Sequence, residues 1–302
     1  MDYKTYSSQI AEKRMEYFFS RLSPTNRTPE YYVNWDKVVT NTKKVEIGLN
    51  TLNYLIGKEN IRSESKELFL QQPQLLKLVP VLIASRDVTL DVLSFDDQDN
   101  MNFQDIDFNT IDLAKIDEYL DFMDNAGLLN FLQRHAVKSL VDYVFGVEAG
   151  LDSNARKNRS GTTMEGIVER NVAKACERLG LEFRAQATSK WMKENWHIRV
   201  PVDKSIRKFD VAVYDKEQHK VYVIETNYYG GGGSKLKSVC GEFATLNQLI
   251  NTSEDDVSFV WVTDGLGWET ARIPISEAFE VIDNIFNLSM LQEDYFVQLL
   301  GK

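Results

Sequence analysis

The sequence has few of the residues that mark secreted, membrane-bound or metal-clustered proteins. Only two cysteines occur, Cys176 and Cys240, which are too few for a disulfide framework and lack the spacing of a metal site. No apolar run reaches the length of about 18 residues that a membrane-spanning helix needs. The first residues lack the basic and then apolar pattern of a signal peptide. We therefore expect a cytoplasmic protein with reduced cysteines and no membrane partner.

Two common signatures of catalysis and nucleotide binding are also absent. The glycine-rich segment 230–233 does not have the spacing of a Walker A loop. Serine and threonine are abundant, but no nucleophile elbow surrounds any of them. The search for chemistry therefore turns from nucleophiles and nucleotide loops to carboxylates.

The sequence does contain a strong separation of charge within a formal net charge of −10. Residues 81–130 hold twelve acidic and two basic side chains, which accounts for the whole excess. Residues 151–210 hold thirteen basic and eight acidic side chains. A basic half favours contact with a phosphate backbone. Solvated surfaces of opposite sign would give the same asymmetry, so both interpretations stay open.

The spacing of apolar residues divides the chain near residue 150. Residues 1–150 show helical periodicity and predict an all-α region. Its acidic stretch at 87–110 predicts a surface loop, because the glycine and distal glutamate of a calcium-binding loop starting at Asp97 are missing. Residues 151–302 predict an α/β domain. Its predicted elements are a helix over 161–179, strands over 181–187, 196–200, 209–214, 221–227 and 257–262, a helix over 234–251 and a helical tail.

Two of these strands flank a polar turn at 215–220 and predict a β-hairpin. A symmetric turn pairs Tyr214 with Val221. The same register then places Asp210 opposite Glu225, on one face of the sheet. Directly opposed residues have Cβ atoms roughly 4.5–5.5 Å apart. The hairpin therefore predicts two carboxylates within reach of a common ligand.

This pair of carboxylates indicates a metal site. Two carboxylates so close repel each other unless a cation lies between them, and Mg²⁺ favours one or two carboxylates with waters and phosphate oxygens. Asn227 shares their face, at a position that nucleases of this plan usually fill with lysine. Asp210, Glu225 and Asn227 are therefore candidate catalytic residues for metal-dependent phosphodiester hydrolysis. The alternative is an acidic pair that faces solvent on an edge hairpin.

The glycines at 230–233 lead into a helix whose first residues attract attention. Ser234 is a candidate N-cap, and Lys235 would lie in the first turn, where the helix dipole disfavours a cation. Backbone approach by the glycines and the charge of Lys235 suit a phosphate. Ser234 and Lys235 are thus candidate DNA contacts, and Lys235 is a candidate source of catalytic charge. A flexible turn with an exposed lysine is the alternative.

A basic segment precedes the helix predicted at 161–179. Arg156, Lys157, Asn158 and Arg159 are expected in a loop that opens this helix. Arginine and asparagine hydrogen-bond to base edges in the major groove or to phosphates, so these four residues are candidate DNA contacts. A solvated basic turn is the alternative.

Glu165 has two interpretations. With Thr162 it fits a capping box, in which the glutamate bonds only to backbone at the helix start. Alternatively, it reaches the metal from a neighbouring helix and is a third ligand beside Asp210 and Glu225. The sequence favours neither.

The residues named so far, with others, resemble the DpnII/MboI family of restriction endonucleases. The resemblance covers nearly the whole chain. Its most specific stretches lie at 146–161, 209–210, 224–229, 233–236 and 261–268. It implies a PD-(D/E)xK core with a mixed sheet flanked by helices. It also implies Mg²⁺ as cofactor and cleavage of double-stranded DNA at GATC to leave 5′ overhangs. A cognate adenine methyltransferase is the implied functional partner.

Residue by residue, the resemblance assigns Asp210 and Glu225 as metal carboxylates. Asn227 matches the family's asparagine at the usual lysine position, and Glu165 matches its upstream acidic position. The chain departs from the family after Leu236, where Asn-Glu-Thr-Ala is usual and residues 237–240 read Lys-Ser-Val-Cys. That departure bears on DNA contact and not on the carboxylates.

Three functions follow from these observations. The first is a type II restriction endonuclease that reads a palindrome as a homodimer, because two-fold proteins match two-fold sites. The second is a structure-specific repair nuclease with the same core. The third is a catalytically inactive DNA-binding module, favoured by the missing lysine at 227 and opposed by the intact acids.

Overall fold

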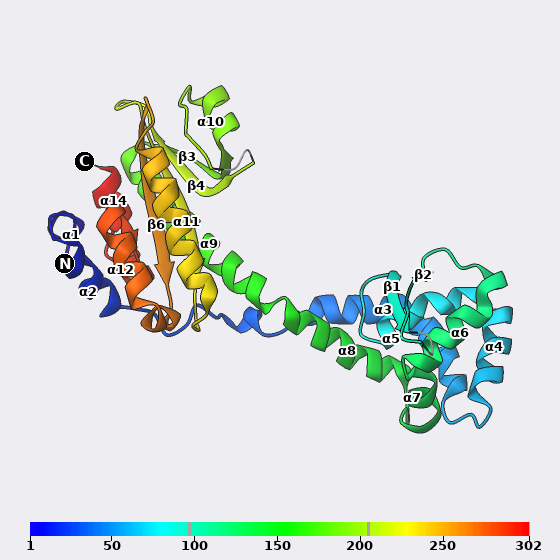
Figure 1. The fold of residues 1–302 in the computed structure, drawn as a ribbon. Helices are drawn as coiled ribbons and strands as arrows, with labels where there is room; N and C mark the ends of the chain where they lie inside the picture. The colour runs from blue at the N-terminus through cyan, green and yellow to red at the C-terminus, as the bar shows by residue number, and fades with distance from the viewer. Residues whose placement is uncertain (96–97, 204–205, 302) are drawn as a thin grey trace. The chain divides into compact units, whose positions relative to one another are not determined.

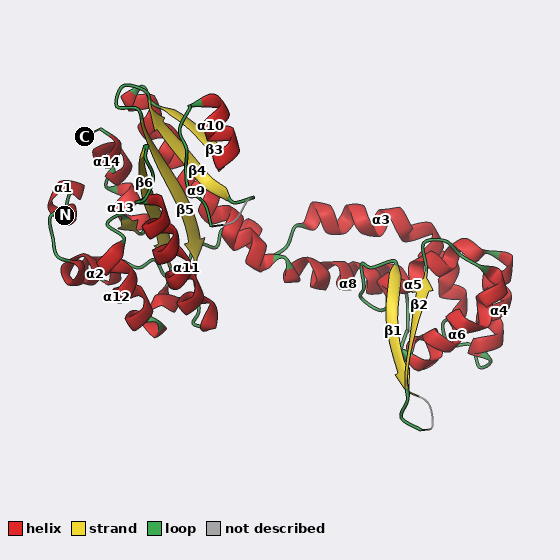
Figure 2. Ribbon diagram, turned by 45° about the horizontal axis from the view of Figure 1, so that its top comes forward, coloured by secondary structure: helices red, strands yellow, loops and turns green. Residues whose placement is uncertain are grey.

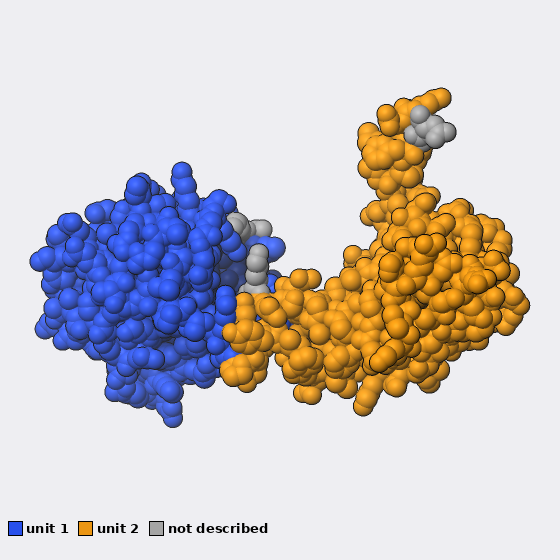
Figure 3. Space-filling model, turned by 90° about the horizontal axis from the view of Figure 1, so that it is seen from below, with its two compact units in different colours: residues 1–28, 157–302 blue, residues 29–156 orange. Residues whose placement is uncertain are grey.

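The computed structural model describes residues 1–95, 98–203 and 206–301, with every side chain except that of Lys157. The chain forms two compact units, coloured separately in Figure 3. Unit 1 combines Met1–Thr28 with Lys157–Lys302, and unit 2 is Pro29–Arg156. The predicted division into residues 1–150 and 151–302 differs from these units, because the first 28 residues fold with the C-terminal half of the chain.

Contacts of two kinds hold the N-terminal segment in unit 1. The carboxylate of Asp264, fully buried, accepts hydrogen bonds from the backbone N–H and hydroxyl of Ser23 at 2.7 and 2.8 Å. The hydroxyl of Tyr6 donates to the Ile285 carbonyl at 2.6 Å, and its buried ring meets those of Phe286 and Tyr295. These partners lie over 240 residues away, so sequence periodicity could not reveal them.

Unit 1 is built on a five-stranded mixed sheet in the order β3-β4-β5-β6-β7 (Figures 1 and 2). β3, β4 and β5 are antiparallel, and β5, β6 and β7 are parallel. The predicted α/β class with a mixed sheet flanked by helices is confirmed. The strands are β3 Glu182–Thr188, β4 Lys208–Asp215, β5 Lys220–Tyr228, β6 Asp256–Asp264 and β7 Ile285–Phe286. The helices are α1 Tyr3–Ser7, α2 Ala11–Phe19, α9 Arg156–Leu179, α10 Ser189–Asn195, α11 Ser234–Ile250, α12 Arg272–Val281, α13 Leu288–Gln292 and α14 Tyr295–Leu300.

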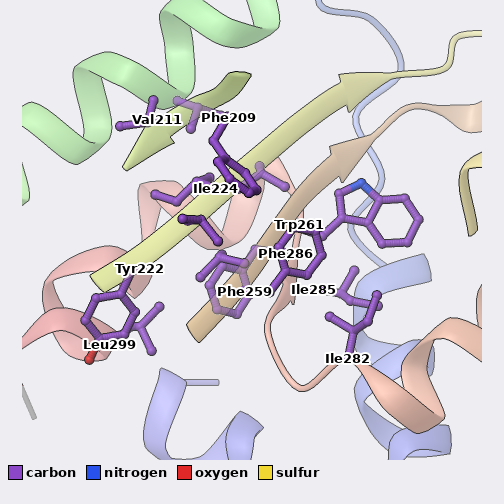
Figure 4. Packing of buried hydrophobic residues seen from close by; sticks show 14 of the residues in the cluster. Phe209, Val211, Tyr222, Ile224, Phe259, Trp261, Ile282, Ile285, Phe286 and Leu299 are labelled. Carbon is purple, nitrogen blue, oxygen red and sulfur yellow. The ribbon is translucent and has the colours of Figure 1, made fainter. Parts of the chain in front are cut away.

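Helices cover both faces of this sheet. Neighbouring residues on a strand point to opposite faces. Trp261 meets Phe243 of α11, whereas the next position, Val262, is paired with Phe286, which meets Tyr295 of α14. Figure 4 shows the large apolar side chains gathered along the strands. Burial on both faces explains why β5 and β6 read as nearly continuous apolar runs.

Two predicted elements of unit 1 are wrong. Residues 196–200 form no strand, because side chains occupy their backbone groups: the Arg199 N–H donates to Asp255, and the Val200 carbonyl accepts from Ser189. The helix predicted from residue 161 begins earlier, at Arg156. The preceding helix α8 ends at Asn154, and Ala155 is its C-cap. Arginine, lysine and asparagine continue the helix there, since nothing in residues 155–160 terminates it.

Unit 2 is helical with one β-hairpin and has its own core. α3 and α8 lie side by side (Figures 1 and 2). Leu49, Phe69, Leu120 and Leu132 are among its fully or nearly buried side chains. The helices are α3 Trp35–Leu52, α4 Ile61–Gln71, α5 Val79–Leu82, α6 Ile116–Asn125, α7 Leu128–Arg134 and α8 Leu140–Asn154. No helix in the described parts of the chain is both long and apolar enough to cross a membrane.

The hairpin of unit 2 corrects the all-α prediction. Strands β1 Thr89–Phe95 and β2 Met101–Asp107 are antiparallel and occupy most of the stretch predicted as a loop. Leu90 and Val92 pack against the core of unit 2, so alternate residues of β1 face inward with the period of a strand. Asp96 and Asp97, where a calcium loop was considered, lie outside the described residues.

Candidate active site

The hairpin β4–β5 has the predicted register. Tyr214 pairs with Val221, and the pairing continues to Val211 and Ile224. One further step places Asp210 opposite Glu225, on the face of the sheet that α11 covers. The backbone N–H of Thr226 donates to Asp210 Oδ2 at 2.7 Å, which fixes the first carboxylate against the neighbouring strand.

Both carboxylates are costly to ionise in this position. Burial raises the pKa of Asp210 to about 6; the Thr226 hydrogen bond opposes this rise and the charge of Glu165 adds to it. Burial, followed by the charge of Asp210, raises the pKa of Glu225, whereas its bond to Arg207 lowers it. Burial and like charge together are the arrangement that a divalent cation relieves. The predicted alternative, a solvent-facing acidic pair, is wrong for Glu225, which is only 8% exposed.

Arg207 is a buried cation at the edge of this site. Its Nη1 donates to Glu225 Oε1 at 2.6 Å, and its Nε and Nη2 donate to the two oxygens of Asp203 at 2.6 and 3.0 Å. Nη2 also donates to Glu242 of α11. The Arg207 side chain is 7% exposed. One guanidinium therefore joins the segment before β4, the strand β5 and the helix α11 at a single point.

Asn227 is held by a chain of hydrogen bonds from the parallel part of the sheet. The indole N–H of buried Trp268 donates to the Thr263 hydroxyl at 2.9 Å, and that hydroxyl donates to Asn227 Oδ1. Thr263 is the partner of Asn227 in the β5–β6 register. Because Oδ1 is engaged, the Nδ2 group remains as the donor that Asn227 can offer to a ligand.

Glu165 and Gln186 approach Asp210 from two other elements. Glu165 lies well inside α9, with Thr162 also within the helix, so the capping-box interpretation is wrong. Its charge contributes to the raised pKa of Asp210. Gln186 of β3 adopts a left-handed backbone (φ 53°), and a hydrogen bond from its side chain lowers the pKa of Asp210. Non-glycine residues in this conformation are strained and concentrate at functional sites.

The start of α11 differs from prediction. Gly233, not Ser234, is the N-cap, and no side-chain bond caps the helix. Ser234 and Lys235 are exposed in the first turn. Lys235 precedes Glu242 by seven residues, which is about two helical turns on the same face of α11.

The glycine segment before α11 has a packing role. A Cβ at Gly267 would lie 2.4 Å from the Gly231 carbonyl oxygen, and one at Gly232 would lie 2.4 Å from the Thr270 hydroxyl. The Gly267 N–H also donates to the Tyr229 carbonyl at 2.8 Å. Two backbone segments therefore touch here, and this close packing accounts for Gly232 and Gly267.

The basic residues predicted as a loop lie in the first turns of α9. Asn158 is exposed, and Arg159 is partly buried. Arg156 is the last residue of unit 2, where its Nε donates to the Tyr32 carbonyl at 3.1 Å. The side chain of Lys157 lies outside the description. Residues 237–240, where the chain departs from the family, differ in exposure. Lys237 and Ser238 are exposed, whereas Val239 and Cys240 are buried in the core.

The donor set fits a hard divalent cation. Asp210 and Glu225 supply carboxylate oxygens. Burial raises the pKa of both groups and the charge of Asp210 adds to the rise at Glu225, so a nearby cation would stabilise their ionised forms. Within the described residues, no group of three or more histidine, cysteine, aspartate or glutamate side chains is placed to hold a metal ion. A site of two carboxylates completed by water and phosphate is the kind that Mg²⁺ adopts, and Ca²⁺ or Zn²⁺ cages need more protein ligands.

The sequence reasoning missed three residues of this site. Arg207 precedes its strand, Glu242 lies far along a helix, and Gln186 belongs to a strand that the pattern did not connect with Asp210. Alternation offered one signal: Ala187 pairs with Phe209 and Ala185 with Val211, so Gln186 falls opposite Asp210. No pattern marks Arg207 or Glu242, because their roles depend on contacts between elements.

Comparisons with known proteins identify the family of the chain. The chain is 58% identical to the type II restriction enzyme LlaDCHI of Lactococcus lactis subsp. cremoris over 302 residues, which cover 100% of this chain and 99% of that protein. It is 41% identical to the type II restriction enzyme MjaIII of Methanocaldococcus jannaschii, with 94% and 98% covered. It is 35% identical to the type II restriction enzyme MboI of Moraxella bovis, with 91% and 92% covered. The model of the DpnII restriction endonuclease family matches residues 14–298. The chain therefore belongs to the DpnII restriction endonuclease family and is a type II restriction endonuclease, a site-specific deoxyribonuclease.

Proposed function

We propose that this endonuclease hydrolyses double-stranded DNA at GATC with Mg²⁺ as cofactor and leaves 5′ overhangs. The observation that carries the metal-dependent chemistry is the pair of half-buried Asp210 and buried Glu225 on facing strands, both with a raised pKa. The proposed specificity is supported by the resemblance to the DpnII/MboI family over the stretches named above. A relative named MboI at 35% identity and one named DpnII at 30% identity add to that support.

Asp210 and Glu225 would hold the metal, and Glu165, whose charge acts on Asp210, is the proposed third acid of the site. Bound Mg²⁺ supplies the Lewis acidity that activates a water and neutralises charge at phosphorus. The chain's own groups prepare the site for this. The Thr226 N–H and the Gln186 side chain hold Asp210, and Asn227 presents an amide donor whose direction Thr263 sets.

The residues proposed for DNA contact lie on two helices. Lys157, Asn158 and Arg159 start the long helix α9 of unit 1, and Ser234 and Lys235 start α11. Lysine and arginine at these positions suit phosphates, which position the protein, whereas amide groups suit base edges. We propose that exposed Lys237 and Ser238, in the part of α11 that departs from the family, affect which bases are read.

We further propose a homodimer, because a two-fold enzyme matches a palindromic site. A cognate adenine methyltransferase would protect the host sequence. Neither a repair nuclease nor an inactive module is favoured by any specific observation, since the carboxylate pair is intact and the relatives are restriction enzymes.

One experiment tests the specificity and the metal together. The purified protein is incubated with a plasmid prepared in GATC-adenine-methylated and unmethylated forms, with Mg²⁺ or with EDTA, and the ends are mapped. We expect Mg²⁺-dependent cuts at unmethylated GATC only, with 5′ overhangs. Discrete cuts elsewhere would contradict the specificity and direct attention to residues 237–238. Cutting in EDTA would contradict the proposed metal dependence.

A further inference from the structure

Arg207 has contacts that the proposed chemistry does not yet use. The side chain is almost fully buried, and each of its three nitrogens donates to a carboxylate. Its partners Asp203, Glu225 and Glu242 come from a loop, a strand and a helix. A buried ion pair is a weak way to hold elements together. The cost of removing the charged groups from water offsets much of the attraction between them.

The position of Arg207 relative to Asn227 suggests another purpose. The position two residues after Glu225 usually carries a lysine in nucleases of this plan, and here it carries a neutral amide. Asn227 is moreover tied to Thr263, so it provides a donor and no charge. Arg207, which directly precedes β4, carries a permanent positive charge. Its Nη1 lies 2.6 Å from Glu225 Oε1.

Arg207 joins three acidic side chains. It forms ion pairs with Asp203, Glu225 and Glu242. The fork geometry of a guanidinium lets it bind one carboxylate with each edge, which a single ammonium does less well. Arg207 engages Oε1 of Glu225 and leaves Oε2 for another ligand.

We propose that Arg207 is the positioning residue that supplies the positive charge missing from position 227, holding Glu225 toward Asp210 and balancing the acids around it. This inference rests on the proposed metal-dependent cleavage. The function of the usual lysine is then divided between two residues: Asn227 donates hydrogen bonds to the substrate side, and Arg207 acts through Glu225. Glu242 and Asp203 anchor the guanidinium from outside the site.

Cleavage by four proteins tests the division of roles. Single-turnover rates at saturating Mg²⁺ are compared for wild type, Arg207→Gln, Asn227→Lys and the double variant. We expect Arg207→Gln to slow cleavage by about 10–100-fold, the range seen when a partner of a metal ligand is removed. Adding Asn227→Lys should recover about tenfold of that loss, because it returns a charge to the same face. A purely structural Arg207 would not be rescued from position 227.

Arg207→Lys covers the possibility that Arg207→Gln does not fold. It keeps the charge and loses the fork, so we expect it to remain folded and to cleave within about tenfold of wild type. Arg178→Gln is the matched control: it removes an arginine of the same unit whose partner Asp294 is exposed, and no change is expected.

A second readout does not require cleavage. Thermal unfolding is measured for each variant with EDTA and with Mg²⁺ alone. In Arg207→Gln the metal becomes the main cation for the acids, so the Mg²⁺-induced rise in Tm should exceed that of wild type. Arg178→Gln should show the wild-type rise.

The outcomes separate the inference from the function on which it rests. The inference is overturned if folded Arg207→Gln cleaves at the wild-type rate, if the double variant is as slow as Arg207→Gln, or if the Mg²⁺-induced rise in Tm does not increase. If wild type cleaves no DNA at all, the proposed function fails, while the Tm comparison still decides whether Arg207 balances the acids.

Discussion

The two units treat buried carboxylates differently. In unit 2, Glu148 accepts hydrogen bonds from Arg86 and Asn41 at 2.8 Å each, and Asp152 accepts one from the Asn34 N–H at 2.8 Å, with Lys37 nearby. In unit 1, Asp210 and Glu225 lie on facing strands, the charge of Asp210 raises the pKa of Glu225, and Arg207 donates to Glu225. A buried acid with its own donors stabilises a fold, whereas two that compete for charge prepare a site for a cation.

The same contrast exists inside unit 1. Asp264 is fully buried, yet it accepts hydrogen bonds from Ser23, Gly265 and Leu288, including three backbone N–H groups. Its surroundings satisfy both carboxylate oxygens. Burial alone therefore does not identify an active-site acid; the number of donors around the carboxylate does.

The largest effect should follow from removing the charge of either site acid. Asp210→Asn and Glu225→Gln each keep the side-chain size and should lower cleavage by on the order of 10³-fold or more. DNA binding in Ca²⁺ should survive, because the proposed contacts to phosphate lie on other residues. Near-wild-type cleavage by either variant would remove the basis for distinguishing these acids from Asp264 and Glu148.

Asp264→Ala should act on folding instead of chemistry. It leaves the N–H groups of Ser23, Gly265 and Leu288 without their acceptor, at a cost of about 3 kcal/mol in the free energy of unfolding. Denaturant unfolding measures the loss. Cleavage per folded molecule should be unchanged, and a selective loss of cleavage at full stability would contradict the structural role.

The metal-free protein should be less stable at high pH because of Asp210. A raised folded-state pKa means that its stabilising contribution is complete below the usual pKa near 4 and disappears as the pH passes about 6. Asp210→Asn in EDTA should therefore gain up to about 2 kcal/mol over wild type at pH 8 and nothing at pH 4. Unfolding curves at the two pH values test this, with Arg178→Gln as control. An equal effect at both would show that Asp210 is ionised at little cost.

Thr263→Val should have the smallest effect. It removes the hydroxyl that joins Trp268 to Asn227 and leaves the strand geometry. We expect cleavage to fall about tenfold, since Asn227 keeps its position on β5 and loses only its orientation. Single-turnover kinetics at saturating Mg²⁺ measure the change. A drop as large as that of Asp210→Asn would move Asn227 from a supporting to a central role.

Much of the site was predictable because it lies on one hairpin. A turn of fixed length sets the register of two adjacent strands, so Tyr214 opposite Val221 leads to Asp210 opposite Glu225. The α/β pattern and α11 were likewise visible in local periodicity, whereas the mixed sheet was expected only from the family resemblance. Residues 196–200 were misread because side chains took the hydrogen bonds that a strand would have used.

Arg207, Gln186 and Glu242 could not be placed in the same way. Their partners belong to other elements, and a guanidinium between three carboxylates leaves no period in the sequence. The start of α9 before Thr162 also removed one interpretation of Glu165, since a capping box requires the residue to stand at a helix end.

The sequence by itself determined the β4–β5 hairpin, its register and the acids on its face, because these depend on residues that are neighbours along the chain. Tertiary structure decided which units the segments join and which acids are left short of positive charge. The electrostatic state of a carboxylate depends on every group that folding brings within a few ångströms, and those groups lie far apart in the chain.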